Sequence, residues 1–153
     1  MKKIALLMLA LLMALSLTAC GQSPKAASTT DTPLNVLVDN VIAKDGLFHM
    51  PKTDLEDVIG IDPADFKEAV FLQDDGMGGR EVLALRAADK NAAARVAAQL
   101  ENYLAQRQKE TRNYLPDAYK LLESARVQTK NLTVVLISGE NAADWTTKLL
   151  AGE

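Results

Sequence analysis

The sequence predicts a small single α+β domain, in which an antiparallel sheet of about four strands is packed by helices. Two pairs of apolar segments predict two hairpins, 69–74 with 81–88 and 126–129 with 132–138. Segments with apolar residues at helical spacing lie before, between and after these hairpins. The expected order is α-α-β-β-α-α-β-β-α, and we expect helices to cover one face of the sheet.

The first helix is expected to begin at Pro33, because proline suits the first helical position and Thr32 can cap the helix. The apolar positions from Leu34 to Ile42 then form one stripe at helical spacing. Gly46 is expected to end this helix, since glycine readily adopts the left-handed conformation found at helix C-termini.

A second, short helix is predicted by the capping-box pattern of Thr53 and Glu56, and Gly60 is expected to stop it. Asp62 precedes a proline and predicts a further turn before the first strand. The glycine-rich residues 75–79 are expected to form the loop of the first hairpin.

Asp89 is expected to cap the longest helix, 90–112. The apolar spacing predicts its buried face as Ala93, Val96, Leu100, Tyr103 and Leu104. The polar residues 106–113 are expected to form a solvent-exposed end. Pro116 predicts the start of the next helix, and 141–150 is expected to be a closing helix that packs Trp145 and Leu149.

The N-terminal segment 1–19 has the pattern of a cleaved secretory signal. Lys2 and Lys3 precede the uncharged segment 4–17, which leads to small residues and Cys20. A retained transmembrane helix is the alternative, but spanning a bilayer takes about 20 apolar residues, and this run is shorter.

Leu17-Thr18-Ala19-Cys20 resembles the lipobox of bacterial lipoproteins. The resemblance implies cleavage between Ala19 and Cys20 and attachment of a diacylglyceryl group to the Cys20 thiol. Two acyl chains are enough for stable membrane attachment, whereas a single chain holds a protein only marginally. Residues 20–32 are therefore expected to be a lipidated cysteine and flexible tether, followed by a domain over 33–153.

Composition excludes several classes of function. Removal of the signal leaves 134 of the 153 residues, and loss of Lys2 and Lys3 changes the formal charge from −3 to −5. Such a charge disfavours binding to nucleic acid. Because Cys20 is the only cysteine and His49 the only histidine, the chain offers neither a disulfide nor a usual zinc site, and no cofactor is expected.

Several acidic residues and the single histidine could indicate a metal, phosphate or catalytic site, but each has a simpler structural explanation. Five acidic residues suggest calcium, but they lack EF-hand spacing and suit helix starts: Asp54, Glu56, Asp57, Asp62 and Asp65. Asp74 and Asp75 beside the glycine-rich loop suggest a metal or phosphate site, but a hairpin turn also requires glycine. His49 has no nucleophile signature nearby and is expected in a loop.

Two further groups of residues are weighed as binding sites. Four aromatic residues could line a ligand groove, although their spacing also suits core packing: Tyr103, Tyr114, Tyr119 and Trp145. Three cations could recognise an anionic group such as a wall-polymer phosphate, although a solvated helix end explains them too: Arg107, Lys109 and Arg112.

From about Leu34 to Trp145, the order of elements and several short motifs resemble bacterial lipoproteins carrying domain-of-unknown-function family 4358. The motifs are Ile59-Gly60-Ile61-Asp62, the Gln/Arg/Lys-rich end of the long helix, Tyr114-Leu115-Pro116 and the segment 122–127. In that family an aromatic residue commonly precedes the glycine, where Ile59 stands here. The family is known mainly from Gram-positive bacteria, which implies the outer leaflet of the cytoplasmic membrane, and it implies no activity or catalytic residue.

Two functional hypotheses follow. The first is a non-enzymatic, membrane-tethered binding module that recognises an envelope protein or wall component. The second is a solute- or wall-polymer-binding lipoprotein associated with a transporter, although solute receptors usually have two lobes. An enzyme would need a carboxylate pair that only folding brings together.

Overall fold

The computed structural model describes residues 32–44, 46–75 and 77–152. The expected signal 1–19, the expected lipid-attachment residue Cys20 and all but Thr32 of the expected tether lie outside these residues. The described elements are α2 (Leu34–Val41), β1 (Phe48–His49), α3 (Thr53–Asp57), the 3-10 turn η2 (Pro63–Asp65), β2 (Phe66–Gln73), β3 (Glu81–Ala87), α4 (Lys90–Thr111), α5 (Pro116–Ser124), β4 (Arg126–Lys130), β5 (Thr133–Ser138) and α6 (Ala142–Ala151). None of the helices in these ranges is long and apolar enough to span a bilayer.

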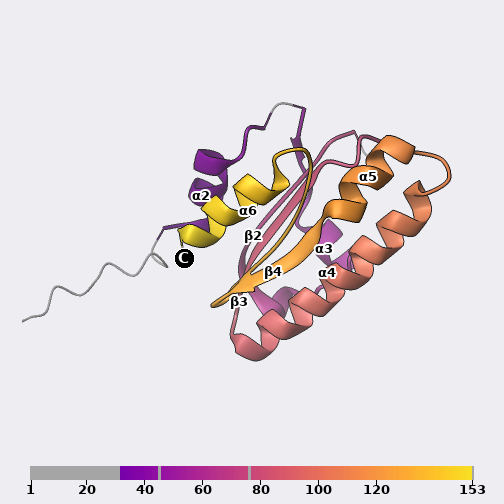
Figure 1. Cartoon of the computed structure of the whole chain (residues 1–153). Coiled ribbons are helices and arrows are strands. Elements are labelled where there is room, and N and C mark those ends of the chain that lie inside the picture. Colours follow the sequence, from indigo (N-terminus) through magenta and orange to yellow (C-terminus); the bar gives the residue numbers. More distant parts are fainter. Residues whose placement is uncertain (1–31, 45, 76, 153) are drawn as a thin grey trace, which may run out of the picture.

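The strands form one antiparallel sheet in the order β1-β2-β3-β5-β4 (Figure 1). The two predicted hairpins, β2–β3 and β4–β5, are confirmed, and they join because β3 pairs with β5. Leu83 lies opposite Leu136 in this central pairing. A fifth strand, β1, was not predicted. It consists of Phe48 and His49, and two residues are too few to show strand periodicity.

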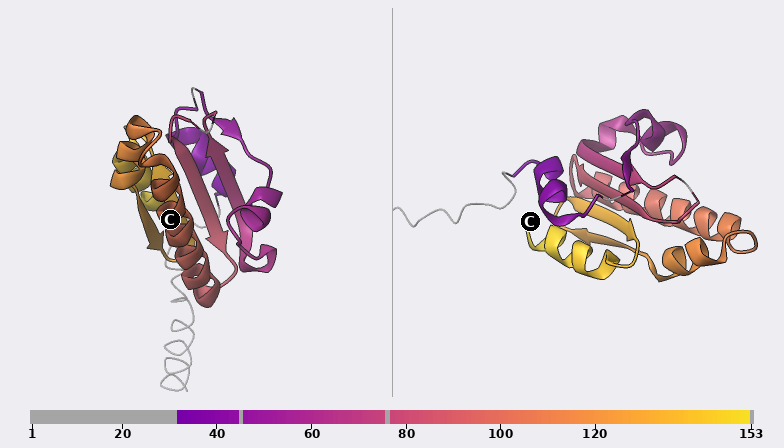
Figure 2. Two further views of the ribbon diagram at one scale, coloured as in Figure 1. Left: turned by 90° about the vertical axis from the view of Figure 1, so that its right-hand side faces the viewer. Right: turned by 90° about the horizontal axis from the view of Figure 1, so that it is seen from above.

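Helices cover both faces of the sheet, so the expectation that only one face is covered is wrong. The helices α3, α4 and α5 pack against one face, while α2 and α6 lie side by side on the other (Figures 1 and 2). The reason is that β3 and β5 are buried at every position, so their alternating side chains fill two cores. The ends of the described domain, Thr32 and Gly152, lie on the same side of the molecule (Figure 1).

The helix starts agree with the sequence in part. Asp62 and Asp89 accept hydrogen bonds from Ala64 N and Ala92 N, as expected of capping residues. Helix α3 begins at Thr53 with Lys52 in the capping position, so the expected capping box does not form.

Helix α2 differs from the expectation at both ends. It begins at Leu34, with Pro33 rather than Thr32 in the capping position, and it ends at Val41 rather than near Gly46. A strand residue supplies the missing cap, because Glu68 Oε2 accepts a hydrogen bond from Leu34 N at 2.6 Å.

The predicted inner face of α4 is confirmed, since all five of its residues are buried. The expectation of an exposed polar end over 106–113 is wrong at three positions. Thr111 is buried, and Arg107 and Gln108 are half-buried, with the Arg107 side chain 16 % exposed. Arg107 lies beside Glu81 of β3, and Gln108 Nε2 donates to Leu122 O of α5 at 2.9 Å. The end of α4 therefore packs against the rest of the domain.

Candidate functional site

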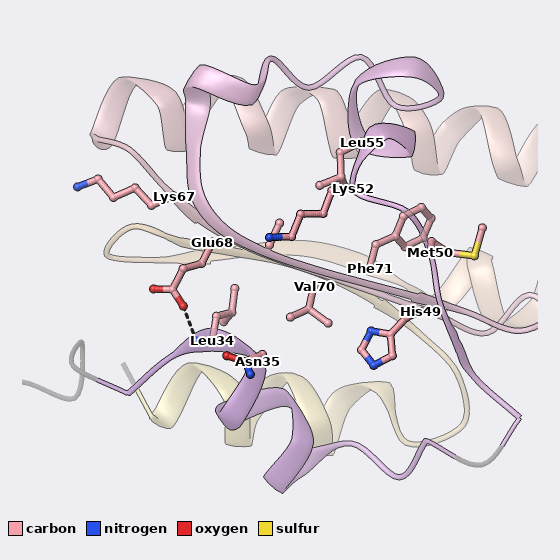
Figure 3. A pocket seen from close by; sticks show the side chains of 11 residues that line it. Leu34, Asn35, His49, Met50, Lys52, Leu55, Lys67, Glu68, Val70 and Phe71 are labelled. Carbon is pink, nitrogen blue, oxygen red and sulfur yellow. Dashed lines mark hydrogen bonds between the residues drawn. The ribbon is translucent and has the colours of Figure 1, made fainter.

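A groove of about 300 Å³ follows the outer edge of β2, and we call it the edge groove (Figure 3). Side chains from both faces of the sheet line it, together with residues of α2, β1 and α3: Leu34, Asn35, His49, Met50, Lys52, Leu55, Lys67, Glu68, Ala69, Val70 and Phe71. The groove therefore wraps around the edge of the sheet. It occupies the position that a further strand paired with β2 would take.

The short length of β1 creates this groove. Strand β1 pairs with only Leu72 and Gln73 of β2, and the last contact along the edge is Met50 N donating to Phe71 O at 2.9 Å. Beyond that point, no strand in the described part of the chain pairs with this side of β2. The backbone N–H and C=O groups of successive residues point to opposite sides of an antiparallel strand. Ala69 lies two residues before Phe71, so its backbone groups also point toward the groove.

The edge groove carries positive charge. Glu68 is already engaged, because its Oε1 accepts a hydrogen bond from Arg86 Nη1 at 2.7 Å and its Oε2 caps α2. Figure 3 shows the Lys52 ammonium directed into the groove and Lys67 directed outward at its rim. His49, expected in a loop, lies in β1 and also lines the groove.

A second cavity, of about 260 Å³, lies on the α4 side of the sheet, and we call it the polar hollow. It is lined by Met50, Asp54, Val58, Phe71, Gln73, Tyr103, Gln106, Arg107 and Glu110. Met50 and Phe71 line both cavities, so the two sites lie on either side of the β1–β2 junction.

Glu81, which is 0 % exposed, forms a buried polar cluster with residues of the polar hollow. Its Oε2 accepts hydrogen bonds from Tyr103 OH at 2.9 Å and from Gln73 Nε2 at 3.3 Å. Arg107 Nε lies 3.8 Å from the same oxygen, which is an ion-pair distance but too long for a hydrogen bond. Within the described ranges, Glu81 Oε1 and Arg107 Nε and Nη2 are buried without a hydrogen-bond partner.

Burial shifts the titration of this cluster. It raises the pKa of Glu81, because desolvation penalises the carboxylate more than the neighbouring Arg107 cation stabilises it. Burial is the main cause that raises the pKa of the Tyr103 hydroxyl, and the negative charge of Glu81 is the second. Tyr103 therefore keeps its proton and acts as a hydrogen-bond donor.

The structure separates residues that the sequence analysis grouped. Arg107 points inward, whereas Arg112 lies over the ring of Tyr119, 5.8 Å from its centroid. The four aromatic residues do not share one groove, since Tyr103 lines the polar hollow, Tyr114 is 84 % exposed and Trp145 is partly buried against the core on the other face. The sequence analysis did not name Glu81 as a candidate site residue. A charged residue at the start of an apolar strand can nevertheless indicate a buried polar site.

Two of the acidic residues before β2, Asp62 and Asp65, have structural partners. Asp65 receives two hydrogen bonds from Arg95, from Nε at 3.0 Å and from Nη2 at 2.5 Å, and these bonds lower the pKa of the Asp65 carboxyl. Asp62 caps η2. In the described part of the chain, no group of three or more histidine, cysteine, aspartate or glutamate side chains is arranged to hold a metal ion.

The residues that flank the glycine-rich segment, Asp74 and Arg80, pair with each other, which supports the interpretation as a hairpin turn. Asp74 N donates to Arg80 O at 3.0 Å, and Asp74 Oδ2 accepts from Arg80 N at 2.9 Å. Gly79 has φ +77°, and a Cβ there would lie 2.7 Å from Ala118 Cα of α5. Glycine is therefore required at this position by both backbone conformation and close packing.

The model of the family described as Domain of unknown function (DUF4358) matches residues 46–139. The match contains the four motifs of the resemblance, but it is narrower than the expected range and leaves out α2 and α6. No curated protein and no solved structure matches the chain. Because the family match spans more than half of the sequence, the chain belongs to the DUF4358 family.

Proposed function

We propose that this protein is an extracytoplasmic lipoprotein that acts as a non-enzymatic binding module at the cell envelope. The signal 1–19 and the lipobox ending at Cys20 support attachment to the membrane through a diacylglyceryl group. For a Gram-positive cell, the anchor lies in the outer leaflet of the cytoplasmic membrane. The domain then extends from the tether at Thr32.

The observation that carries the binding role is the open edge of β2. An extended segment of another protein can add to such an edge through backbone hydrogen bonds, while side-chain contacts supply specificity. Lys52 and Lys67 favour a segment with acidic side chains, since Glu68 is already paired with Arg86. We therefore propose an acidic, extended segment of an envelope protein as the occupant of the edge groove.

The bulge between Phe66 and Glu68 and the presence of Lys67 limit pairing at this edge. Bulges and lysines are common devices that prevent unwanted association of edge strands. The stretch available to a partner is thus short, around Ala69, and a partner must also use the side-chain contacts of the groove. This requirement favours a specific partner over general aggregation.

Anchoring is tested by cell fractionation of the Cys20→Ala variant. We expect this variant to remain unprocessed or to leave the membrane fraction, because the thiol that would carry the diacylglyceryl group is gone. Normal processing together with retention in the membrane would refute lipid anchoring.

Partner binding is tested by in-cell photo-cross-linking of the native lipoprotein. A cross-linking amino acid is placed at Ala69 in the edge groove and, as a matched control, at Gln128 on the opposite edge strand β4. We expect one dominant adduct from position 69 that maps to an acidic, extended segment and is lost in the Lys52→Glu, Lys67→Glu double variant. Equal adducts from both positions, or none from position 69, would refute docking at this edge.

The polar hollow favours a second candidate function, a solute- or wall-polymer-binding lipoprotein associated with a transporter. Its enclosed shape and its polar and charged lining side chains, among them Gln106, Arg107 and Glu110, suit a small polar ligand better than a protein segment. Ligand-dependent thermal stabilisation tests this function, because a ligand that binds only the folded state raises the apparent stability. Specific turnover of a substrate by the purified protein would contradict the non-enzymatic role in both proposals.

A further inference from the structure

We propose that a cleft between α6 and β4 is a binding site for a small phosphate monoester, a solute that carries a terminal phosphate group. The cleft has a volume of about 210 Å³, and we call it the α6 cleft. Helix α6 packs against β5 and against the edge strand β4 (Figure 2). The inference goes beyond both proposed functions, because the α6 cleft shares no lining residue with the edge groove or the polar hollow.

Thr146 places a hydroxyl group without a hydrogen-bond partner in the α6 cleft. The residue is only 5 % exposed, and it lines the cleft from the inner face of α6. In the described part of the chain its Oγ1 makes no hydrogen bond, whereas Oγ1 of the next residue, Thr147, donates to Ala143 O at 2.8 Å. Unlike Thr133 Oγ1, Thr146 Oγ1 is not sealed from solvent, so it opens into the cleft. An enclosed hydroxyl of this kind can donate to a ligand in the cavity.

The first turn of α6 supplies backbone donors at one end of the cleft. Asn141 occupies the capping position, but its side chain makes no capping hydrogen bond. Ala142 N donates to Gly139 O at 3.2 Å, and the amides of Ala143 and Asp144 have no partner among the residues that the structure describes. Free amides and the helix dipole together favour an anion, and phosphate in particular, at the start of this ten-residue helix.

Arg126 supplies a positive charge at the same end. It is the first residue of β4 and lies opposite Ile137 of β5, from which the chain passes through Gly139 into α6. Arg126 Nη1 donates to Glu123 O at 2.7 Å and to Ala125 O at 2.6 Å, and these bonds hold the guanidinium in place. Nε and Nη2 make no hydrogen bond within the described ranges, and the side chain is exposed. This side of the guanidinium can therefore donate to two oxygens of a phosphate.

Two acidic residues near the start of α6 restrict which anion fits. Asp144 is paired with Lys148, whose Nζ lies 2.7 Å from Asp144 Oδ2, and it does not line the cleft. Glu140 does line the cleft, and its carboxylate repels an anion but accepts hydrogen bonds from hydroxyl groups. Gln128 adds a side-chain amide at the wall formed by β4. The cleft therefore suits a phosphate attached to a hydroxyl-bearing body better than a bare anion.

The donors of the cleft favour a phosphate over a carboxylate. A carboxylate has two oxygens, which the Arg126 guanidinium alone can satisfy. A phosphate monoester has three free oxygens and a charge of about −1.5 to −2, so it can also use the α6 amides and the Thr146 hydroxyl. The volume of about 210 Å³ limits the body to a few carbon atoms, since pockets for larger ligands have about 300 Å³ or more.

The inference is tested with the full protein, purified from cells in a non-ionic detergent, by titration calorimetry and thermal unfolding. The probes are glycerol 3-phosphate as the monoester, inorganic phosphate as the bare anion, and glycerophosphoglycerol as the diester found in a lipid headgroup, with glycerol as the uncharged control. We expect glycerol 3-phosphate to bind saturably and the diester to bind about tenfold more weakly, because the diester has one free oxygen and one charge fewer. Tighter binding of the diester would overturn the monoester class and indicate a lipid headgroup. No saturable binding of any phosphate probe would overturn the site.

Substitutions locate the site. Thr146→Val removes the hydroxyl but keeps the shape of the side chain, and we expect it to weaken glycerol 3-phosphate binding about tenfold. Thr147→Val is the matched control, because that hydroxyl bonds to its own helix and lies outside the cleft. Arg126→Gln should weaken binding by at least about tenfold, and Arg112→Gln, also outside the cleft, is its control. Unchanged affinity in both Thr146→Val and Arg126→Gln would refute the site.

Glu140→Gln tests the electrostatics with an effect of opposite sign. The substitution removes a repulsive charge beside the anion, so inorganic phosphate should bind about threefold more tightly. A merely structural effect would weaken the binding of every probe instead, and weaker binding of inorganic phosphate would overturn the position of the anion beside Glu140. All these variants leave the edge groove intact, so loss of the adduct from position 69 would refute edge docking alone.

Discussion

Glu68 in β2 caps the first residue of α2, because its Oε2 accepts the hydrogen bond of Leu34 N at 2.6 Å. Its other oxygen accepts from Arg86 Nη1 at 2.7 Å, and Arg86 also donates to Thr32 O at 3.2 Å. One strand carboxylate therefore orders both the start of the helix and the residue at which the expected tether joins the domain.

The Glu68→Ala variant tests this relationship. We expect it to lower the free energy of unfolding by about 1–3 kcal/mol, since it removes a helix cap and one partner of the largely buried Arg86. Urea unfolding gives the free energy, and hydrogen exchange should show faster exchange of the α2 amides. Glu140→Ala, an exposed loop residue, is the control, and equal effects of the two substitutions would contradict the cap.

The buried carboxyl of Glu81 predicts an unusual pH dependence of stability. Its pKa is raised in the folded protein, chiefly by burial, so the folded protein retains this proton to a higher pH than the unfolded chain does. The contribution of Glu81 to stability is therefore complete below its pKa in the unfolded chain, and it is lost as the pH rises through the folded pKa.

The Glu81→Gln variant isolates this contribution from the other carboxyls. Asp65 acts in the opposite direction, because Arg95 lowers its pKa and stability is lost as the pH falls through that value. We expect the unfolding free energy of the wild type minus that of Glu81→Gln to decrease as the pH rises above 4.5, the ordinary pKa of a glutamate carboxyl. A difference that is constant or that rises with pH would show that Glu81 is ionised in the folded protein without cost.

Local sequence patterns predict most of this fold, and tertiary pairing accounts for the rest. The apolar strands β3 and β5, the Asp89 cap and the inner face of α4 each have a signal within a few residues. The pairing of Arg107 with Glu81 depends on where α4 crosses the sheet, which helix periodicity does not encode. The same holds for the edge groove, which exists because β1 stops after His49.

The sequence also indicates that helices cover both faces of the sheet, although the prediction of two hairpins led us to expect only one covered face. An antiparallel sheet with one exposed face alternates apolar and polar residues, whereas β3 and β5 each contain a run of four consecutive apolar residues, 82–85 and 134–137. Such continuous runs indicate strands buried on both sides. The apolar stripe of α2 and the closing helix α6 were available to cover the second face.

Two glycines with positive φ should respond differently to alanine. At Gly60, with φ +80°, a Cβ would approach only the Gln99 side chain, at 4.0 Å, whereas at Gly79, with φ +77°, it would lie 2.7 Å from Ala118 Cα. We expect Gly60→Ala to cost about 1–2 kcal/mol of unfolding free energy, from backbone strain alone. Gly79→Ala should cost clearly more, because α5 must also move. Equal losses in urea unfolding would contradict the close packing of the β2–β3 hairpin against α5.

Helices α2 and α6 lie outside the segment that the family model matches, yet they bury one whole face of the sheet. If α6 is integral to the domain, removing a buried side chain from it should cost as much as a substitution in any other part of the core. Leu149 is 1 % exposed, and Leu149→Ala is therefore expected to lower the unfolding free energy by about 2–4 kcal/mol.

The adjacent Leu150 provides the matched control for Leu149→Ala. It is the same residue type on the same helix but only half-buried, so Leu150→Ala should cost less. Both variants should also unfold in a single urea transition if the two faces of the sheet share one cooperative unit. A loss below about 1 kcal/mol in Leu149→Ala, or an early separate transition, would show instead that α6 is a peripheral addition to the DUF4358 domain.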